Sequence, residues 1–291
     1  MLPAMSSASK VVITAALTGV AATRKQCPAI PYTPVEIAEE ALRAYEAGAA
    51  IVHIHGREDD GSASFRPELF SQIAEEVRSR CPVLLNWSTG AVGLSMEERV
   101  APVRAVPPDM AALNMGSMNY AKYSPKTKQF YFDFVFQNPF VDITKCLEVL
   151  NEHGVRPELE CFDTGHVQNA RPLIDQGLLC PPYQFSLILG VLGGAPATTE
   201  QLVQMRRTLP DGASWQLIGI GTIQWKMVAA ALSMGGNIRV GLEDNLYLGP
   251  GVMASSNGEL VEKAVRMARD VGLEPATVEE ARKILGLRET A

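Results

Sequence analysis

The tripeptide His53-Ile54-His55 is the part of the sequence that most directly suggests chemistry. It closes an apolar run, Ala50–His55, that is typical of a β-strand, and side chains two positions apart on a strand point to the same side. Two neutral imidazoles placed in this way can bind one divalent metal ion. We interpret the pair as metal ligands. The alternative is that one histidine packs in the interior while the other hydrogen-bonds to nearby backbone.

Glu243 offers a third ligand, because it directly follows the apolar run Ile238–Leu242. Two histidines and a glutamate leave a coordination position open for water or substrate, as catalytic zinc sites require. Arg239 shares the strand parity of Glu243 and is expected to point inward below the metal. Asp244 starts the next loop and is a candidate general base. Alternatively, Arg239, Glu243 and Asp244 form a purely structural ion-pair cluster.

Small polar residues and glycines follow other predicted strands. Ser88-Thr89-Gly90 could hold a carboxylate or an enolate oxygen through hydroxyl and backbone N–H groups, although such a triplet is also a common turn. Glycine loops could let backbone amides approach a phosphate or thioester, or they are only tight turns. The glycines concerned are Gly190, Gly193, Gly194 and Gly221.

These candidate residues follow or end elements that alternate regularly along the chain. The predicted strands are Val11–Ala16, Ala50–His55, Val83–Trp87, Met110–Asn114, Glu158–Phe162, Gln184–Leu189, Trp215–Ile220 and Ile238–Leu242. The predicted helices are Pro34–Ala47, Pro67–Arg80, Met96–Ala105, Phe140–His153, Val167–Gln176, Thr199–Leu209, Thr222–Met234, Gly258–Val271 and Val278–Leu285. An alternating segment within Tyr123–Pro139 predicts a hairpin inserted after the fourth strand.

Strands followed in turn by helices predict an α/β protein, a (β/α)8 TIM barrel, with one catalytic domain over residues 1–291. A doubly wound open sheet is the main alternative. It usually carries a glycine-rich turn after the first strand, where this sequence has the single glycine Gly19. Barrel enzymes build their sites at the carboxyl ends of the strands, so the barrel would bring His53, His55 and Glu243 to one face.

The composition is that of an ordinary globular protein, with 291 residues, 47% of them hydrophobic and 20% charged. A net charge of -6 without a basic run argues against a nucleic-acid partner. The five cysteines lack C-x-x-C spacing and predict free thiols in a reducing, cytoplasmic compartment. We interpret the apolar stretch Val11–Ala22 as a buried strand running into a loop rather than a signal peptide. No run approaches the roughly 20 apolar residues of a membrane span.

Landmarks spread along the chain resemble those of the β-keto acid cleavage enzyme family, from Ile13 to the C-terminal helices. They are Val52-His53-Ile54-His55-Gly56-Arg57, Trp87-Ser88-Thr89-Gly90, Leu113-Asn114-Met115-Gly116-Ser117, Ile188-Leu189-Gly190-Val191 and Arg239-Val240-Gly241-Leu242-Glu243-Asp244-Asn245. The resemblance implies a (β/α)8 barrel, usually a homotetramer. It also implies a zinc ion on two histidines and one glutamate, which correspond to His53, His55 and Glu243.

The resemblance further implies a Claisen-type exchange between a β-keto acid and acetyl-CoA. Asp244, supported by Arg239 and Ser88, would remove a proton from the carbon between the carboxylate and the keto group. The enolate would attack the thioester, and a retro-Claisen cleavage would release acetoacetate and a new acyl-CoA. Acetyl-CoA contacts are expected at the four glycines named above. Substrate contacts are expected at Thr89, Gly90, Asn114 and Glu160, with Asp163 and His166 as further candidates for substrate selection.

At one position the sequence departs from the family pattern. Members that accept a 5-amino substrate carry a glutamate for its ammonium group in a Thr-Gly-Ala-Glu-Thr-Thr-Arg run, where this chain has Ala21. We therefore predict that the 5-amino substrate is not preferred. An uncharged or bulkier β-substituent near Ala21, or a quaternary ammonium caged by aromatic rings, would suit the site instead. Thr222 also stands where that relative has an arginine, which alters one expected contact to CoA phosphate.

Three other classes remain as alternatives. A metal-dependent aldolase would also form an enolate at such a site. An amidohydrolase would carry its histidine pair after the first strand and further histidines after strands five and six, whereas only His166 follows strand five here. A non-catalytic binding module would leave the convergence of the metal-ligand candidates with Asp244 unexplained.

Overall fold

Parallel strands form a closed barrel in the computed structural model, which describes residues 9–288. The strands follow one another in the order β10-β11-β12-β13-β2-β3-β6-β7, with β7 pairing back onto β10. Their bounds are β2 Ile13–Ala16, β3 Ile51–Ile54, β6 Leu84–Trp87, β7 Met110–Asn114, β10 Arg156–Cys161, β11 Gln184–Leu189, β12 Ser214–Gly219 and β13 Asn237–Val240. The predicted TIM barrel is therefore confirmed. The single-domain prediction covered residues 1–291, of which 1–8 and 289–291 lie outside the described residues.

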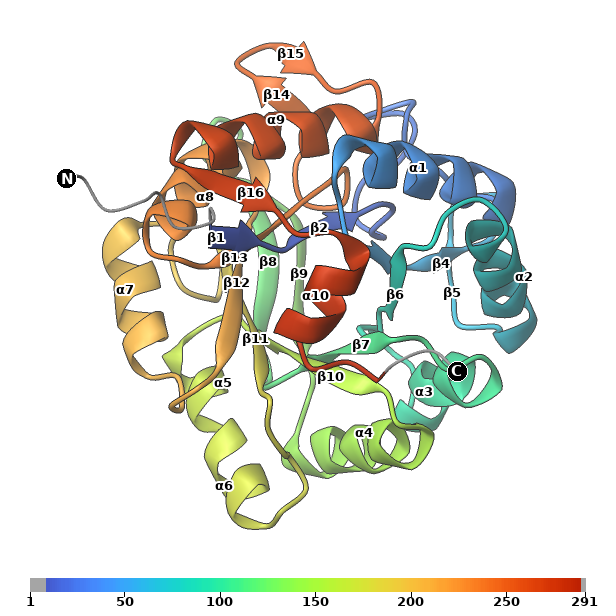
Figure 1. Ribbon diagram of the computed structural model, residues 1–291, viewed down its shortest axis with the longest axis vertical. Helices are drawn as coiled ribbons and strands as arrows, with labels where there is room; N and C mark the ends of the chain where they lie inside the picture. Colours follow the sequence, from blue (N-terminus) through green and yellow to red (C-terminus); the bar gives the residue numbers. More distant parts are fainter. Residues whose placement is uncertain (1–8, 289–291) are drawn as a thin grey trace, which may run out of the picture.

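Helices surround the barrel (Figure 1). They are α1 Pro34–Ala47, α2 Pro67–Arg78, α3 Met96–Ala105, α4 Phe140–His153, α5 Thr164–Gln168, α6 Ala170–Asp175, α7 Thr199–Arg207, η1 Gly221–Ile223, α8 Gln224–Ser233, α9 Asn257–Asp270 and α10 Val278–Ile284. Capping explains their starts. The Thr33 side chain accepts from the Glu36 N–H and the Glu36 side chain accepts from the Thr33 N–H, and Ser95 begins α3 with Glu98 in the same way.

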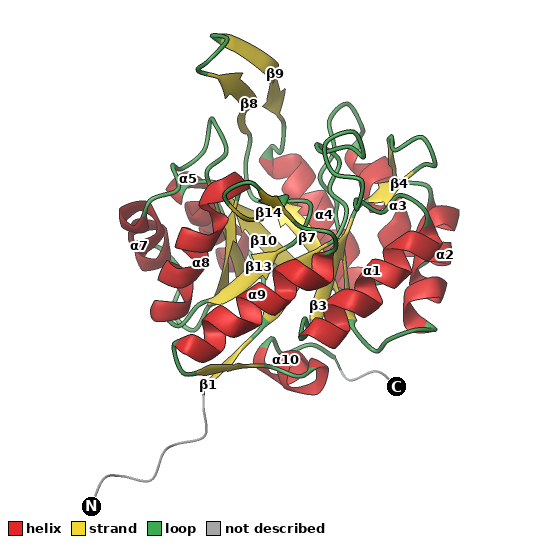
Figure 2. Ribbon diagram, turned by 90° about the horizontal axis from the view of Figure 1, so that it is seen from above, coloured by secondary structure: helices red, strands yellow, loops and turns green. Residues whose placement is uncertain are grey.

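The two ends of the barrel differ. α10 packs across the amino-terminal ends of the strands, where Ala281 and Leu285 join Ile51 and Leu84 in one buried apolar cluster. A hairpin of β8 (Met118–Ser124) and β9 (Gln129–Phe136) rises from the opposite end (Figure 2). α10 thus seals one end, and the site residues at the carboxyl ends of the strands lie at the other.

Short two-stranded sheets lie outside the barrel sheet. They pair β1 Ser9–Val11 with β16 Leu273–Pro275, β4 Gly56–Arg57 with β5 Ala63–Ser64, β14 Tyr247–Gly249 with β15 Val252–Met253, and β8 with β9. The inserted hairpin was predicted after the fourth barrel strand, and it lies there. Its bounds were wrong, because the first strand begins at Met118 rather than in the Tyr123–Pro139 segment.

Several element predictions need correction. The predicted strand Val11–Ala16 is split between β1 and β2, and the predicted helix Thr222–Met234 begins with η1 before α8. The predicted helix Val167–Gln176 is two short helices, α5 and α6, and α5 begins earlier because the Asp163 side chain accepts from the His166 N–H. The last barrel strand ends at Val240 rather than Leu242, because Gly241 has a φ of 141° that breaks the extended conformation. Glu243 therefore lies on the turn after β13, so the parity argument holds for Arg239 and not for Glu243.

Gly241 supports a prediction about the turn that carries Glu243. An added Cβ at Gly241 would lie 2.1 Å from the carbonyl oxygen of Ala16 on β2. Gly241→Ala must therefore displace β2 or the turn, and the positive φ adds strain. We expect it to lower the free energy of unfolding by at least about 2 kcal/mol in urea denaturation. Gly249→Ala, whose added Cβ meets nothing within 4 Å, is the control. Equal stability of the two variants would contradict this account.

The cysteines agree with the expected free thiols. Cys180 is exposed, while Cys27, Cys81, Cys146 and Cys161 are buried, and none forms a disulfide. Burial raises the pKa of the Cys146 thiol to about 12, which keeps it unreactive. Within residues 9–288, no helix combines the length and the apolar character that a membrane crossing needs.

Candidate active site

The three predicted metal ligands converge at the hairpin end of the barrel. His53 Nε2 lies 3.7 Å from Glu243 Oε2, and His55 Nε2 lies 3.5 Å from Glu243 Oε1. One possible ligand atom from each residue lies within 4.8 Å of the others. The two imidazole rings point to the same side, with centroids 5.3 Å apart. Strand parity predicted this convergence for the histidines, although β3 ends at Ile54 and His55 lies just after the strand rather than on it.

The charge states of these side chains suit a divalent metal. Burial and the nearby Arg239 hold the pKa of His53 well below its usual range, so the ring is neutral and keeps a free lone pair. Burial alone would raise the pKa of Glu243, but Arg239 and both histidines hold it well below its usual range. Glu243 Oε2 is buried and has no hydrogen-bond partner among the described residues. The neutral His53 ring, the imidazole of His55 and an incompletely satisfied carboxylate fit a zinc ion.

Arg239 joins the ligand cluster to two further carboxylates. Its Nε donates to Asp244 Oδ2 at 2.9 Å and its Nη2 donates to Asp244 Oδ1 at 3.0 Å, a two-point contact that fixes the carboxylate. Nη2 also donates to Glu243 Oε1 at 2.5 Å, and Nη1 donates to Glu160 Oε1 at 3.3 Å. Arg239 is 2% exposed. One guanidinium thus orients Glu243, Asp244 and Glu160 together.

Asp244 and Glu160 have different proton affinities. Burial raises the pKa of Asp244 to about 6, although Arg239 acts to lower it. Burial is the main cause that raises the pKa of Glu160 to about 8, and the negative charge of Glu158 is the next. Glu160 therefore holds a proton more readily than Asp244. Two buried carboxyl groups that differ in this way can serve separately as a proton acceptor and a hydrogen-bond donor.

The loop after β2 reaches the ligand cluster at Gly19. A Cβ added there would lie 2.6 Å from Glu243 Cγ, so the backbone passes directly over that ligand. Arg57 holds this loop by donating to the carbonyl oxygens of Gly19 at 2.8 Å and Ala22 at 2.7 Å. No role was predicted for Arg57. The signal that could have indicated one is its position, two residues after the ligand candidate His55. Ala21, on the same loop, is exposed.

The segment after β6 is only partly available to a substrate. Ser88 is buried, and its Oγ accepts from the Gly90 N–H at 3.2 Å. The Thr89 hydroxyl donates to the carbonyl of Ala112 at 2.5 Å, so it already serves the fold. Asn114 is buried beside Gly90, whose added Cβ would lie 3.2 Å from Asn114 Nδ2. The structure thus brings Ser88, Gly90 and Asn114 together and directs the Thr89 hydroxyl elsewhere.

The candidate glycines fall into two groups. Gly193 and Gly194 pack closely, since added Cβ atoms would lie 1.9 Å from the Asn119 carbonyl oxygen and 2.8 Å from the Phe162 carbonyl oxygen. Gly190, Gly193 and Gly221 have positive φ angles of 100°, 105° and 80°, and a Cβ at Gly221 would meet nothing within 4 Å. The Gly221 N–H donates to the backbone carbonyl of Asp244 at 2.7 Å, which connects that loop to the site.

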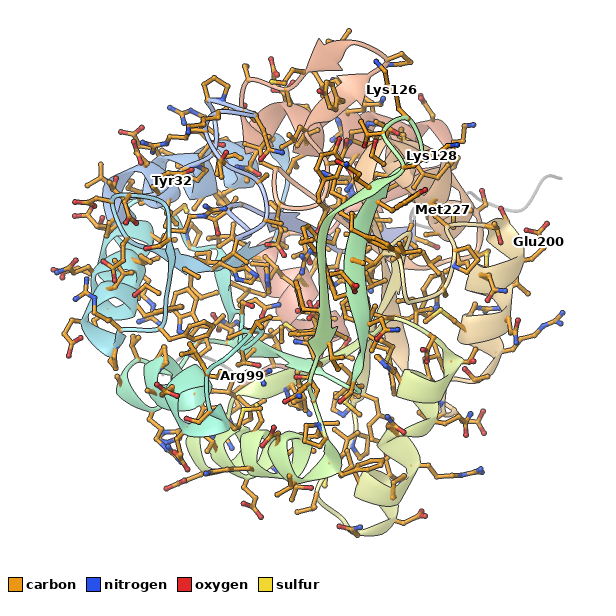
Figure 3. All side chains as sticks on the ribbon, turned by 180° about the vertical axis from the view of Figure 1, so that it is seen from behind. Tyr32, Arg99, Lys126, Lys128, Glu200 and Met227 are labelled. Atoms are coloured by element: carbon orange, nitrogen blue, oxygen red, sulfur yellow. The ribbon has the colours of Figure 1, made fainter. Side chains whose placement is uncertain are left out.

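An aromatic cluster on the hairpin was not predicted as part of the site. Tyr120 stacks on Phe134 at 5.5 Å and on Phe132 at 6.0 Å, and meets Phe162 edge-on at 6.0 Å. Burial raises the pKa of Tyr120 to about 12, and the negative charges of Glu243 and Asp244 raise it as well. The hairpin crosses this end of the barrel, with Lys126 and Lys128 at its tip (Figure 3). Only the aromatic alternation of β9 signalled this cluster in the sequence.

The side chain of His166 is engaged away from the metal ligands. It is buried, its Nδ1 accepts from the Phe162 N–H at 3.3 Å, and its Nε2 lies 3.4 Å from the Ser117 carbonyl oxygen. Asp163 caps α5. These contacts link β10 to the base of the hairpin, so both residues shape the rim of the barrel rather than its metal-ligand cluster.

Comparisons with known proteins match nearly the whole chain. A family model described as beta-keto acid cleavage enzyme matches residues 10–287. A 3-keto-5-aminohexanoate cleavage enzyme of Fusobacterium nucleatum subsp. nucleatum is 43% identical over 282 residues, which cover 96% of this chain and 99% of that protein. A 3,5-dioxohexanoate:acetyl-CoA acetone transferase of Paraburkholderia graminis is 35% identical, covering 99% of each chain. Among solved structures, apo ObcA shares the fold with a TM-score of 0.76 at 23% identity, covering 89% of this chain and 66% of that one.

Proposed function

The chain belongs to the β-keto acid cleavage enzyme family, and from this premise we propose that it is a zinc enzyme that exchanges the acyl group of a β-keto acid with acetyl-CoA. Family membership makes it an acyltransferase-type enzyme acting on β-keto acids. Zinc, the residue roles and the substrate are the proposal. The observation that carries it is the convergence of His53, His55 and Glu243 beside Asp244, which Arg239 holds.

The residues of the chain account for proton removal. Asp244 accepts a proton from the carbon between the carboxylate and the keto group of the substrate. Arg239 holds both oxygens of that carboxylate in a fixed direction, with contacts of 2.9 and 3.0 Å. Glu160, in its protonated form, donates a hydrogen bond to a substrate oxygen. When bound by His53, His55 and Glu243, zinc would supply Lewis acidity for the negative charge that develops on the substrate oxygens.

The remaining steps conserve atoms and electrons. The substrate carbanion attacks the carbonyl carbon of acetyl-CoA and expels the CoA thiolate. That thiolate attacks the original keto carbon, and the bond between this carbon and its carboxymethylene neighbour breaks. Asp244 returns its proton to the carbon that leaves. The products are acetoacetate and the acyl-CoA of the former keto group, with no change in oxidation state.

Sequence similarity and the loop after β2 favour different substrates. The relative with 43% identity is named for a 3-keto-5-amino acid, whereas Ala21 gives an ammonium group no charged partner here. We propose an uncharged or bulkier β-substituent as the preferred substrate. The aromatic cluster around Tyr120 supports this proposal, because stacked rings favour apolar or soft cationic groups over a small hydrated ammonium.

The position of Ala21 leads to a prediction about specificity. We expect Ala21→Glu to raise kcat/KM for 3-keto-5-aminohexanoate relative to 3-ketohexanoate by about fivefold, the size of one exposed charge pair. Both substrates would be measured by acetoacetate release with saturating acetyl-CoA. Val20→Glu adds the same charge one residue earlier and should leave the ratio unchanged. A parent enzyme that already prefers the amine would contradict the proposed substrate class.

The experiment that tests the function is a coupled assay with zinc-loaded protein, acetyl-CoA and a panel of β-keto acids. Acetoacetate formed only when acetyl-CoA is present supports the acyl exchange. Cleavage of a panel member without acetyl-CoA would favour the metal-dependent aldolase, and hydrolysis of amide or ester analogues would favour an amidohydrolase. We also propose a homo-oligomer, which sedimentation would test, and a cytoplasmic location.

A further inference from the structure

A belt of hydrogen bonds crosses the barrel interior, and the reaction steps above do not use it. The Thr14 hydroxyl donates to Gln216 Oε1 at 3.0 Å, and Gln216 Nε2 donates to Glu158 Oε1 at 2.6 Å. The Ser186 hydroxyl donates to the same Glu158 oxygen. Asn86 Nδ2 donates to the other oxygen, Glu158 Oε2. Glu158 is 1% exposed and receives donors on both oxygens.

The carboxylate of Glu158 determines which way the Asn86 amide points. Glu158 Oε2 accepts from Asn86 Nδ2, so Asn86 presents its NH2 group to Glu158. The amide oxygen, Oδ1, then faces the opposite way. Asn86 is 1% exposed, so water does not offer an alternative partner that would favour the flipped amide. Glu158 thus fixes the donor and acceptor ends of Asn86.

Asn86 is also the neighbour of a metal-ligand candidate. Asn86 on β6 and His53 on β3 are directly paired positions of adjacent parallel strands, and both side chains point into the barrel. Asn86 Oδ1 and His53 Nδ1 are both buried, and neither has a hydrogen-bond partner within residues 9–288. Asn86 Oδ1 is a hydrogen-bond acceptor, and His53 Nδ1 is a donor when it carries the ring proton. With the proton on Nδ1, these two buried atoms on paired positions are complementary.

We propose that Glu158 and Asn86 are positioning residues of the metal centre. Glu158 holds the Asn86 amide with its oxygen toward His53, and that oxygen retains the proton on His53 Nδ1. Nε2, which faces Glu243 at 3.7 Å, therefore keeps its lone pair for the metal. The inference rests on the metal site proposed above and adds to it two residues that touch neither the metal nor the substrate.

The first measurement is the zinc dissociation constant of the full chain, by competition with a chromophoric chelator. We expect Asn86→Ala and Glu158→Gln each to weaken zinc binding by about 10- to 100-fold. Because both act through one contact, the double variant should bind zinc no more weakly than Asn86→Ala. Thr14→Val removes a hydrogen bond at the far end of the same belt without changing volume, and should leave the constant within about twofold.

A second readout is made on the zinc-loaded parent protein and needs no substitution in Asn86 or Glu158. The chain has four histidines, so 15N labelling of histidine gives few ring signals in the zinc-loaded parent protein. His53, assigned by loss of its signals in His53→Gln, should carry its proton on Nδ1. A proton on Nε2 instead would overturn the inference even if a variant failed to fold.

The outcomes separate this inference from the metal site itself. Parent-like zinc affinity in folded Asn86→Ala and Glu158→Gln would overturn the positioning role and leave the metal site intact. Equal weakening by Thr14→Val would also overturn it, because the belt would then act only on general stability. A parent chain that binds no zinc would overturn the proposed metal site and this inference with it.

Discussion

Glu243→Gln is expected to lose bound metal and turnover together. The substitution keeps the size of the side chain but removes the charge that both histidines face at 3.7 and 3.5 Å. Loss of a partner outside the metal shell costs about 10- to 100-fold in affinity, and loss of an anionic ligand should cost more. Without the metal, the transition state loses several kcal/mol of stabilisation by a Lewis acid, so kcat should fall by about 1000-fold. Metal per chain after gel filtration and kcat in the coupled assay are the two measurements.

Glu160→Gln is the matched control for this variant. Glu160 also accepts from Arg239, at 3.3 Å, but it is not one of the three convergent ligands. The Glu160→Gln variant should therefore retain the metal content of the parent, whatever the effect of the substitution on substrate turnover. Glu243→Gln should stay folded, since Arg239 keeps its two-point contact with Asp244. Parent-like metal content and turnover in Glu243→Gln would disprove the ligand assignment.

Asp244→Asn is expected to separate metal binding from catalysis. The amide cannot accept a proton, so kcat should fall by about 100- to 10,000-fold, the usual contribution of a positioned general base. Metal content should remain near that of the parent, because the ligand triad does not include Asp244. The direct readout is exchange of the substrate proton into deuterium oxide without acetyl-CoA, followed by NMR. We expect the enzyme-catalysed exchange to disappear in the variant.

Asp163→Asn is the control for this second experiment. Asp163 caps α5 and lies outside the Arg239 cluster, so its neutralisation should leave proton exchange unchanged.

In Asp244→Asn, breaking the Arg239–Asp244 pair leaves a buried guanidinium with fewer anionic partners, and some loss of stability is expected as well. A folded Asp244→Asn variant that exchanges the proton at the parent rate would assign the base to another residue.

The barrel could be predicted from the sequence because its local signals agree. Capping boxes at Thr33 and Ser95 fixed the starts of α1 and α3, and apolar runs fixed strands such as Met110–Asn114. Where two signals competed, the prediction failed. Apolar residues continued through Ile238–Leu242, but the φ of 141° at Gly241 ended the strand earlier. A glycine alone does not reveal which backbone angle it adopts.

The site could be predicted only where chemistry and local spacing coincide. His53 and His55 lie two residues apart, and Glu243 and Asp244 are neighbours, so short-range reasoning found them. Asn86 and Glu158 are 72 residues apart and meet only across the closed barrel. Tyr120 depends on how the hairpin folds back over the barrel end. Contacts of this kind follow from strand register, which the sequence of each strand does not specify by itself.

The position of helix α10 bears on the order in which the two reactants bind. Ala281 and Leu285 of α10 cover the amino-terminal ends of the strands, so we expect both reactants to approach the ligands from the hairpin end. In the proposed exchange the small keto acid binds at the ligands themselves, and acetyl-CoA approaches from the same end. A CoA molecule that arrived first would stand in its path. We therefore expect sequential addition with the keto acid first, and substrate inhibition by excess acetyl-CoA.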